Sequence, residues 1–513
     1  MTPAITEKNC LVNVYRDTKK VDGWVFSIGI AISLLGIGWT VGAILDAGAS
    51  QFIPYEAETI WFGIFGATYL GLHGLRRMAW VSAPALLSIE ALIYFALIPG
   101  WRFAGGEEQV DAGFAHAMLL VLVGFVGFWV GSLLLLRKSP MQFSPVTSYT
   151  SSRVALISAA MCGLGIAGNI MLWRAGLFSY LADQATKKSN QGLVQWLLLL
   201  ADLLTASLAI SAIEVLGKKS KDPLIKIVFV LSLTASIGFG LMSGMKGNIL
   251  DPLLLLVLIY GLTNERLPKS AILLPVLLIV VVYPFVGAYR KNLNNGYRAQ
   301  VDTVSGLEAT LSKSIGDAFL TFGSRNTMTE DRYSKQVTSR LSYLSYVRDV
   351  VDLPSPSMLR GDERVWLAPL YPLIPRFIWK TKPVLDKGVR LNIALGLGDT
   401  SSSVSTPIGD LYAIYGAKGV AGGMFVWGVC LQLVMNWFGR TAPSEIKLFI
   451  YVSMIRALTN LEADVVGLIA GVVQLGLFVL IIAYSVYGRR GSAILVDPNT
   501  LLDSGAINGA TQV

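Results

Sequence analysis

The residues best suited to chemistry gather in one hydrophilic stretch, Tyr289 to Thr406, which lies between two apolar segments. Within it, the run from Leu370 to Pro383 mixes aromatic and basic side chains and contains three prolines. Prolines keep such a run out of a regular helix, and an arginine such as Arg376 offers a planar fork that fits a phosphate group. The pattern predicts either a phosphate-binding strip or an anchor at a membrane surface, where aromatic residues gather.

A second pattern follows directly, from Thr406 to Gly416. A hydroxyl residue before Pro407 is a helix-start signal, and Gly416 is a natural stop. The pattern predicts a short helix whose free backbone amides form an anion site beside a serine-rich segment. Asp410 is expected in its first turn or just after it. The alternative is a capped connector without a ligand.

Charged residues also lie within or beside the apolar segments, where they are costly and usually face a polar cavity. Arg456 shares a helix face with Thr459 and Asn460, and Glu462 and Asp464 follow within eight residues. Lys246 and Asp251 bracket the turn between two apolar segments on the same side. Glu90 and Asp202 are expected deeper in their segments, and Glu214 near the opposite, cytoplasmic end. These residues are candidates for a functional site or for paired structural groups.

Two further arginines, Arg290 and Arg298, stand where the hydrophilic stretch begins, each directly after a tyrosine. They are either phosphate ligands or interfacial residues whose long side chains reach back to the membrane surface.

The composition requires that most of this chain be dissolved in lipid. Of 513 residues, 53% are hydrophobic and 15% are charged, and the mean hydropathy is +0.58. A soluble domain is about 25% charged. Apolar runs long enough to cross a bilayer recur, so we predict an all-α polytopic membrane protein with about twelve spans. The predicted spans are 24–45, 59–75, 80–99, 114–136, 154–173, 193–215, 224–243, 248–262, 271–288, 419–438, 445–460 and 465–487.

Lysine and arginine are concentrated in alternate short connections, which places both termini in the cytoplasm and the long hydrophilic loop outside. Both short helices and irregular chain are expected in that loop. The predicted organisation is a cytoplasmic tail (1–23), a nine-span bundle (24–288), the external loop (289–418), three further spans (419–487) and a second cytoplasmic tail (488–513).

The sequence disfavours two classes of function, a metal centre built from cysteine and histidine and the binding of nucleic acid. The cysteines Cys10, Cys162 and Cys430 and the histidines His73 and His116 lie far apart in the sequence and lack the spacing of metal ligands. The net charge of +9 sits largely at helix ends, as membrane topology demands, and does not indicate nucleic acid binding.

The order of these features resembles the Wzy-type oligosaccharide repeat-unit polymerases of bacterial O-antigen and exopolysaccharide assembly. The resemblance covers roughly residues 245 to 440 and combines an apolar bundle, a large loop near the C-terminus and two motifs. The residues that carry it are Pro372, Pro375, Arg376, Trp379, Lys382, Pro383, Gly388, the helix from Thr406 to Gly416, and Gly419.

The resemblance implies a GT-C-like fold and a glycosyltransferase of the bacterial inner membrane, without metal or cofactor, that polymerises polyprenyl-diphosphate-linked oligosaccharides at the outer face. A chain-length regulator, a flippase for the lipid-linked unit and membrane lipid would be its partners. The residues expected to bind the diphosphate or glycan are Arg376, Arg290, Arg298, Lys382, Arg456, Trp379, Tyr412 and Thr406. The candidates for the base that takes a proton from the acceptor hydroxyl are Asp410, Glu462 and Asp464.

Three alternatives stay open. An O-antigen ligase shares the same broad plan, although such ligases tend to use a histidine in an outer loop and none is evident here. A secondary transporter or flippase also has many spans and buried charges, but transporters are built from matched halves. The long loop between the ninth and tenth predicted spans breaks that balance. A scaffold role is the third alternative.

Overall fold

The structure is a computed structural model, and it describes the chain in separate ranges. These are residues 54–74, 82–104, 111–136, 152–178, 191–264, 282, 284–293, 303–323, 342–359, 361, 364–374, 378–383, 386–396, 406–439 and 445–487. The first predicted span, both tails and most of the span predicted at 271–288 lie outside the described residues.

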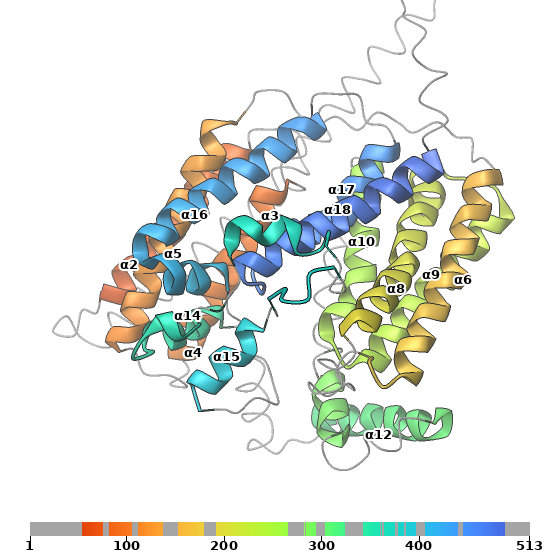
Figure 1. Ribbon diagram of the computed structural model, residues 1–513, viewed down its shortest axis with the longest axis horizontal. Coiled ribbons are helices and arrows are strands. Elements are labelled where there is room, and N and C mark those ends of the chain that lie inside the picture. The colour runs from red at the N-terminus through yellow and green to blue at the C-terminus, as the bar shows by residue number, and fades with distance from the viewer. Residues whose placement is uncertain are drawn as a thin grey trace, which may run out of the picture.

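Helices make up the described part of the chain (Figure 1). The α-helices are α2 (Pro54–Gly74), α3 (Ala83–Leu92), α4 (Ile98–Ala104), α5 (Ala112–Leu134), α6 (Ser152–Arg174), α8 (Gln191–Ala212), α9 (Pro223–Ser243), α10 (Lys246–Asn264), α12 (Val304–Gly323), α14 (Tyr343–Val351), α15 (Lys387–Ala394), α16 (Pro407–Gly439), α17 (Glu445–Leu458) and α18 (Val465–Tyr487). Two π-helices, η3 (Ile93–Leu97) and η5 (Ile213–Gly217), and two 3₁₀-helices, η7 (Pro356–Leu359) and η8 (Val365–Leu370), complete the set.

Eight helices of the described chain are long and apolar enough to cross a membrane. They are Ala83–Phe103, Ala112–Leu134, Ser152–Arg174, Leu193–Gly217, Pro223–Ser243, Lys246–Thr263, Pro407–Phe438 and Val465–Tyr487. The protein is therefore an all-α, multi-pass membrane protein, as predicted. Helices α2 and α17 occupy two more of the predicted spans without belonging to the eight. With 14 residues, α17 is too short, since such a helix rises only about 20 Å against a hydrocarbon core of roughly 30 Å.

Glycines allow α5 and α16 to pack with their backbones almost in contact. A Cβ built on Gly131 of α5 would lie 2.3 Å from the carbonyl oxygen of Phe425, and one on Gly428 of α16 would lie 2.1 Å from that of Phe128. Only glycine fits at either position, because the clashing atoms belong to backbone. Small residues at such crossings are the usual means by which membrane helices approach closely.

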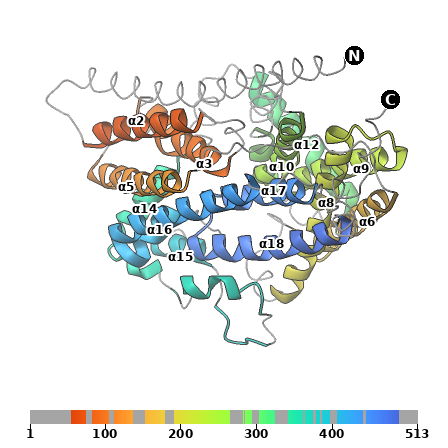
Figure 2. The ribbon, with the colours of Figure 1, turned by 90° about the horizontal axis from the view of Figure 1, so that it is seen from above.

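The α6–α8 pair repeats this arrangement. A Cβ on Gly165 would meet the backbone nitrogen of Leu204 at 2.3 Å. Buried serines supplement the close packing, because the hydroxyl of Ser207 bonds those of Ser158, at 3.1 Å, and Ser232, at 3.0 Å. These two helix pairs form the cores of the two groups of helices in Figure 1, and α17 and α18 run between the groups (Figures 1 and 2).

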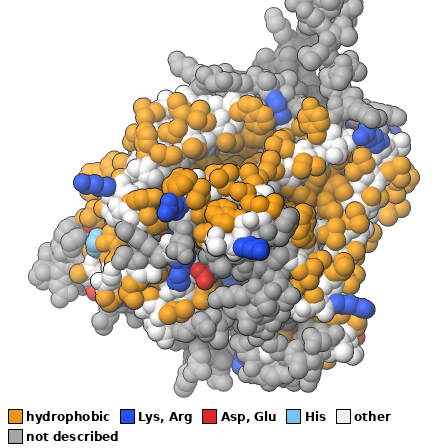
Figure 3. All heavy atoms as spheres, in the orientation of Figure 1, with side chains coloured by type: hydrophobic (Ala, Val, Ile, Leu, Met, Phe, Trp, Pro, Cys, Tyr) orange, Lys and Arg blue, Asp and Glu red, His pale blue; other side chains and the backbone are white. Residues whose placement is uncertain are grey.

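The elements of the long loop lie at one end of the bundle, which we call the loop side and define by α14, α15 and the turn 459–464. Helix α12 lies across the loop-side ends of the neighbouring helices (Figure 1). Its buried face, Leu307 and Ala318, belongs to the same core cluster as Tyr289 and Leu293. Large apolar side chains cover much of the visible surface (Figure 3), as expected for helices that face lipid.

The helix predicted from Thr406 is present. Helix α16 begins at Pro407, and the Thr406 hydroxyl accepts a hydrogen bond from the Gly409 amide at 3.2 Å. Gly416 has φ +69° and interrupts the helical conformation, so a short loop-side helix and a membrane span join across a kink. The predicted N-cap and the predicted break are both confirmed.

Candidate functional site

A cluster of charged and aromatic residues converges on the loop side from four separate parts of the chain. Arg456 of α17 forms an ion pair with Asp251 of α10. Glu90 of α3 and Glu462, in the turn after α17, both interact electrostatically with the Arg456 guanidinium. We call these four residues, with Tyr94 and Tyr343, the Arg456 cluster.

The Arg456 side chain is partly open to its surroundings. It is 56% exposed and its partner Asp251 is 30% exposed. Gly247 lies directly beside it, because a Cβ there would stand 2.6 Å from Nη2 of Arg456. An arginine that is both anchored by a carboxylate and accessible offers unused guanidinium donors to an anionic ligand.

Glu462 is the exposed carboxylate of the cluster. Its side chain accepts a hydrogen bond from the Tyr343 hydroxyl. Its backbone amide donates to Oδ1 of Asn460 at 2.8 Å, which fixes the turn that carries it. Tyr343 is itself buried, and its ring stacks on Tyr94 with 4.4 Å between ring centroids.

A π-helix helps to place two of these residues. Glu90 lies in the last turn of α3, and Tyr94 lies in the π-helix η3 that follows it. Single π-helical turns within α-helices occur often at functional sites, because the extra residue changes the direction of the side chains around it. The third predicted span therefore contains an irregular turn at the height of the Arg456 cluster.

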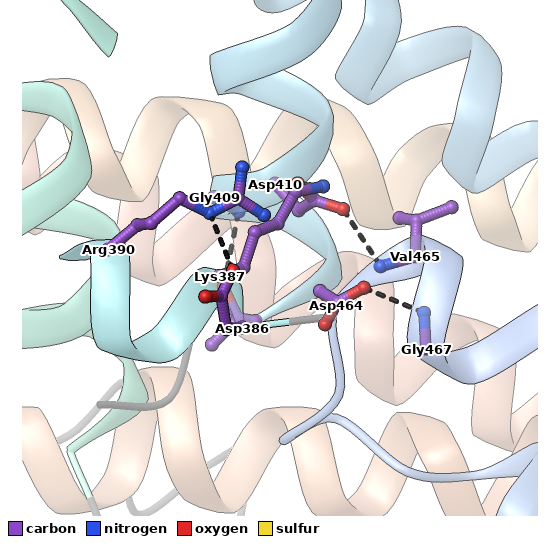
Figure 4. Close-up of polar contacts among 9 residues, drawn as sticks. Asp386, Lys387, Arg390, Gly409, Asp410, Asp464, Val465 and Gly467 are labelled. Carbon is purple, nitrogen blue, oxygen red and sulfur yellow. Dashed lines mark hydrogen bonds and ion pairs between the residues drawn. The ribbon is translucent and has the colours of Figure 1, made fainter. Parts of the chain in front are cut away.

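A second charged cluster lies nearby and has a different character (Figure 4). Lys387 of α15 forms an ion pair with Asp410 of α16, and their side chains are 4% and 1% exposed. The other oxygen of Asp410 accepts a hydrogen bond from the Val465 amide at 2.8 Å. Asp464 caps the start of α18 by accepting from the Gly467 amide at 2.7 Å. We call Lys387, Asp410, Asp464 and Val465 the Lys387 cluster.

The Lys387 cluster joins three elements that are distant in sequence. It ties the loop helix α15 to the short first part of α16 and to the first turn of α18. Both carboxylates are satisfied by protein donors, and at a helix N-terminus they also complement the helix dipole. This arrangement suits a structural connection better than proton transfer, since Asp410 has little access to a substrate.

The predicted phosphate ligands are distributed unevenly. Arg376 and Arg298 lie outside the described residues. Arg290 donates to the Gly244 carbonyl at 2.8 Å and so caps the end of α9. Lys382 donates to the Ile374 carbonyl at 3.3 Å within its own segment. The structure thus brings Arg290 to the start of α10, the helix that also carries Asp251.

The structure also describes the other three residues that were predicted to bind substrate, Trp379, Tyr412 and Thr406. Trp379 packs against Tyr371 with 5.6 Å between ring centroids, and Tyr412 packs edge-on against His116 at 5.7 Å. Thr406 is fully buried, and its hydroxyl is engaged in the cap described above.

Sequence reasoning missed three residues of interest. Tyr94 follows Glu90 by one helical turn, and that spacing is the signal that could have found it. Tyr343 is the first residue of α14, a short helix with one buried and one partly exposed face. The sequence does not indicate which part of the protein the buried face packs against. His116, which the sequence only excluded as a metal ligand, is exposed in the first turns of α5.

Within the described ranges, no three or more histidine, cysteine, aspartate or glutamate side chains are grouped so that they could hold a metal ion.

Comparison with known proteins identifies a family. Residues 166–441 match the family described as a domain of unknown function, DUF8712. The match covers more than half of the 513 residues, and the chain belongs to this family. No curated protein and no solved structure matches the chain.

Proposed function

We propose that this member of the DUF8712 family is a membrane glycosyltransferase that polymerises polyprenyl-diphosphate-linked oligosaccharide repeat units into a bacterial surface polysaccharide. The reaction would take place at the outer face of the cytoplasmic membrane, with the loop side facing outward. The multi-pass fold supports a lipid-linked substrate, because the tail must stay in the bilayer while its head group reacts.

The observation that carries the proposal is the Arg456 cluster. An accessible arginine and an accessible carboxylate, Glu462, lie together where the long loop meets the membrane spans. Glycosyl transfer from a lipid diphosphate needs both groups. The diphosphate gains negative charge as it leaves, and a cation already in place stabilises that charge. The acceptor hydroxyl loses a proton, which a carboxylate can take.

The proposed step is a direct displacement at the anomeric carbon. The acceptor hydroxyl oxygen forms a bond to that carbon while the bond from the carbon to the phosphate oxygen breaks. Glu462 takes the hydroxyl proton, and the polyprenyl diphosphate departs with the bonding electron pair towards Arg456. The anomeric centre gains oxocarbenium character, as in glycoside hydrolysis.

The remaining predicted residues take supporting roles in this proposal. Arg290 lies near the N-terminus of α10, and the predicted ligands Arg376, Arg298 and Lys382 would contribute further positive charge from the loop. Of the three carboxylates predicted as base, we favour Glu462, because the Lys387 cluster engages Asp410 and Asp464. Asp410 then holds the loop in place.

The test is a polymerisation assay with purified protein, native lipid-diphosphate-linked repeat units and EDTA. Products are resolved on a gel for the wild type, for Arg456→Ala and for Arg376→Ala. Lys226→Ala, an exposed cation in the first turn of α9, is the matched control. We expect a glycan ladder from the wild type and the control and its loss from both arginine variants. The absence of a ladder from the wild type with its native repeat unit would refute polymerisation.

One observation favours O-antigen ligation as a second candidate. His116 is an exposed histidine at the loop-side end of α5, and its ring contacts Tyr412 of the predicted substrate-binding helix. A ligase would transfer the glycan to a different lipid-anchored acceptor rather than to a second repeat unit. Supplying both acceptors separates the two functions, and loss of transfer in His116→Ala but not in Glu462→Gln would favour ligation.

A further inference from the structure

Tyr343 links the long loop to the Arg456 cluster through two different contacts. Its ring lies against Tyr94 and, at 6.2 Å between centroids, against the edge of Phe95. Its hydroxyl donates to the Glu462 carboxylate. Because the side chain is 3% exposed, it is not free to contact a substrate itself.

Helix α14, which Tyr343 begins, is fastened to the bundle at several points. Arg348 forms ion pairs with Asp111, just before α5, and with Asp352 at 3.1 Å. Its guanidinium also lies 4.5 Å from the ring centroid of Phe114. At the other end, Arg102 donates to the Ser345 hydroxyl at 3.4 Å. These contacts hold Tyr343 at a fixed place relative to the membrane spans.

Charges of both signs act on the Glu462 carboxylate. Arg456 attracts its carboxylate, while Glu90 repels it, and Tyr94 lies in the same group. Asp251 already pairs with Arg456. A carboxylate on a short turn would move to the guanidinium and occupy the anion site if no other donor held it, since opposite charges attract at close range.

We infer that Tyr343 is a positioning residue that holds the Glu462 carboxylate away from Arg456, so that the carboxylate can accept a proton and the arginine can bind an anion. The site is then complete only when α14 is docked on η3. This inference rests on the proposed glycosyl transfer for its catalytic consequence but not for the contact itself.

The test compares Tyr343→Phe, which keeps the ring and removes the hydroxyl, with Glu462→Gln. Tyr484→Phe, which removes the hydroxyl of an exposed tyrosine near the C-terminal end of α18, is the matched control. In the polymerisation assay we expect Tyr343→Phe to lower kcat about tenfold. This is less than the roughly 10²- to 10⁴-fold contribution of a general acid or base, because Glu462 itself is kept. The acidic limb of its pH–rate profile should move to higher pH, because a carboxylate that has lost a hydrogen-bond donor is protonated more easily.

A second readout does not depend on activity. Infrared difference spectra between the wild type and Glu462→Gln isolate the Glu462 carboxylate band, which is then followed as a function of pH. In Tyr343→Phe, the pH at which that band is lost should rise, whereas Tyr484→Phe should leave it unchanged.

The outcomes separate the two proposals. An unchanged infrared titration in Tyr343→Phe overturns the positioning role, whether or not the protein polymerises glycans. A shifted titration in a protein that makes no polymer supports the positioning role and refutes the proposed function. A tenfold loss of activity with an unmoved pH profile would mean that Tyr343 only supports the fold.

Discussion

The Arg456 cluster and the Lys387 cluster contain the same kinds of residues and do different things with them. In the Lys387 cluster, each charge meets an opposite charge or a backbone amide, and the ion pair is buried. In the Arg456 cluster, one arginine faces three carboxylates and stays half exposed. Both clusters contain acidic and basic side chains, so residue type does not distinguish them. The candidate site differs from the structural connection in that its charged side chains are accessible and its carboxylates outnumber its cation.

The largest expected effect on stability comes from breaking the buried ion pair between Lys387 and Asp410. Lys387→Met leaves the Asp410 carboxylate buried without its cation, which costs about 3–5 kcal/mol. We expect a large fall in the midpoint of thermal unfolding in detergent, with faster proteolysis of the loop around α15. Lys387→Met combined with Asp410→Asn should recover most of the loss, because the amide oxygen can still accept from Val465. No recovery would show that the lysine stabilises the fold through other contacts.

Breaking the accessible ion pair between Arg456 and Asp251 should affect activity rather than stability. Arg456→Ala is expected to slow polymerisation about 10²- to 10³-fold, the usual cost of removing one electrostatic contact to a transition state. Because both partners are partly exposed, the thermal midpoint should barely move. A fall in stability as large as that of Lys387→Met, with activity retained in the surviving folded protein, would erase the distinction between the clusters.

A milder change tests whether Arg456 must occupy its present place. Gly247→Ala introduces a methyl group at the position where a Cβ would crowd Nη2 of Arg456. The guanidinium can move, since it ends a flexible side chain, so stability should be preserved. We expect polymerisation to fall by a few-fold through the displaced charge, measured as initial rates beside Gly71→Ala, a position with open space around it. Equal rates for the two variants would show that the arginine need not occupy this place.

The smallest expected effect is at the start of α16. Thr406→Ala removes the hydroxyl that caps the helix next to Asp410 and should destabilise the protein by about 1 kcal/mol. Thr406→Ser should be close to the wild type, because it keeps the acceptor. Thermal unfolding of the two variants tests this, and equal midpoints would mean that the cap contributes nothing to the Lys387 cluster.

Local rules predicted the parts of the fold that local chemistry decides. Thr406, Pro407 and Gly416 determine a helix start and a break by their own conformational preferences, and the apolar runs determine the spans by their length. Arg456 and Glu462 were recognised because charge inside or beside an apolar segment is conspicuous. All these signals are contained in a few neighbouring residues.

Tertiary contacts decided the rest. Lys387 looks like an ordinary exposed lysine in the sequence, and only the folded chain shows that it is buried against Asp410. The Tyr94–Tyr343 stack joins residues about 250 positions apart, and no periodic pattern encodes such a pairing. The π-helical turn at Ile93–Leu97 is likewise invisible, because its residues would be equally suited to an α-helix.

That π-helical turn has an evolutionary consequence. A π-helix accommodates one residue more per turn than the α-helix it replaces, so a single-residue deletion converts one into the other. Deleting that extra residue would therefore leave Glu90 and Arg102 in about their present relative orientation. If the turn instead became α-helical at unchanged length, the two side chains would rotate by about 100° relative to each other, because an α-helix has 3.6 residues per turn. Glu90 and the Arg102–Ser345 contact could then not both keep their present places. Family members that share the Arg456 cluster are therefore expected to have either this π-helical turn or a regular α-helix that is one residue shorter.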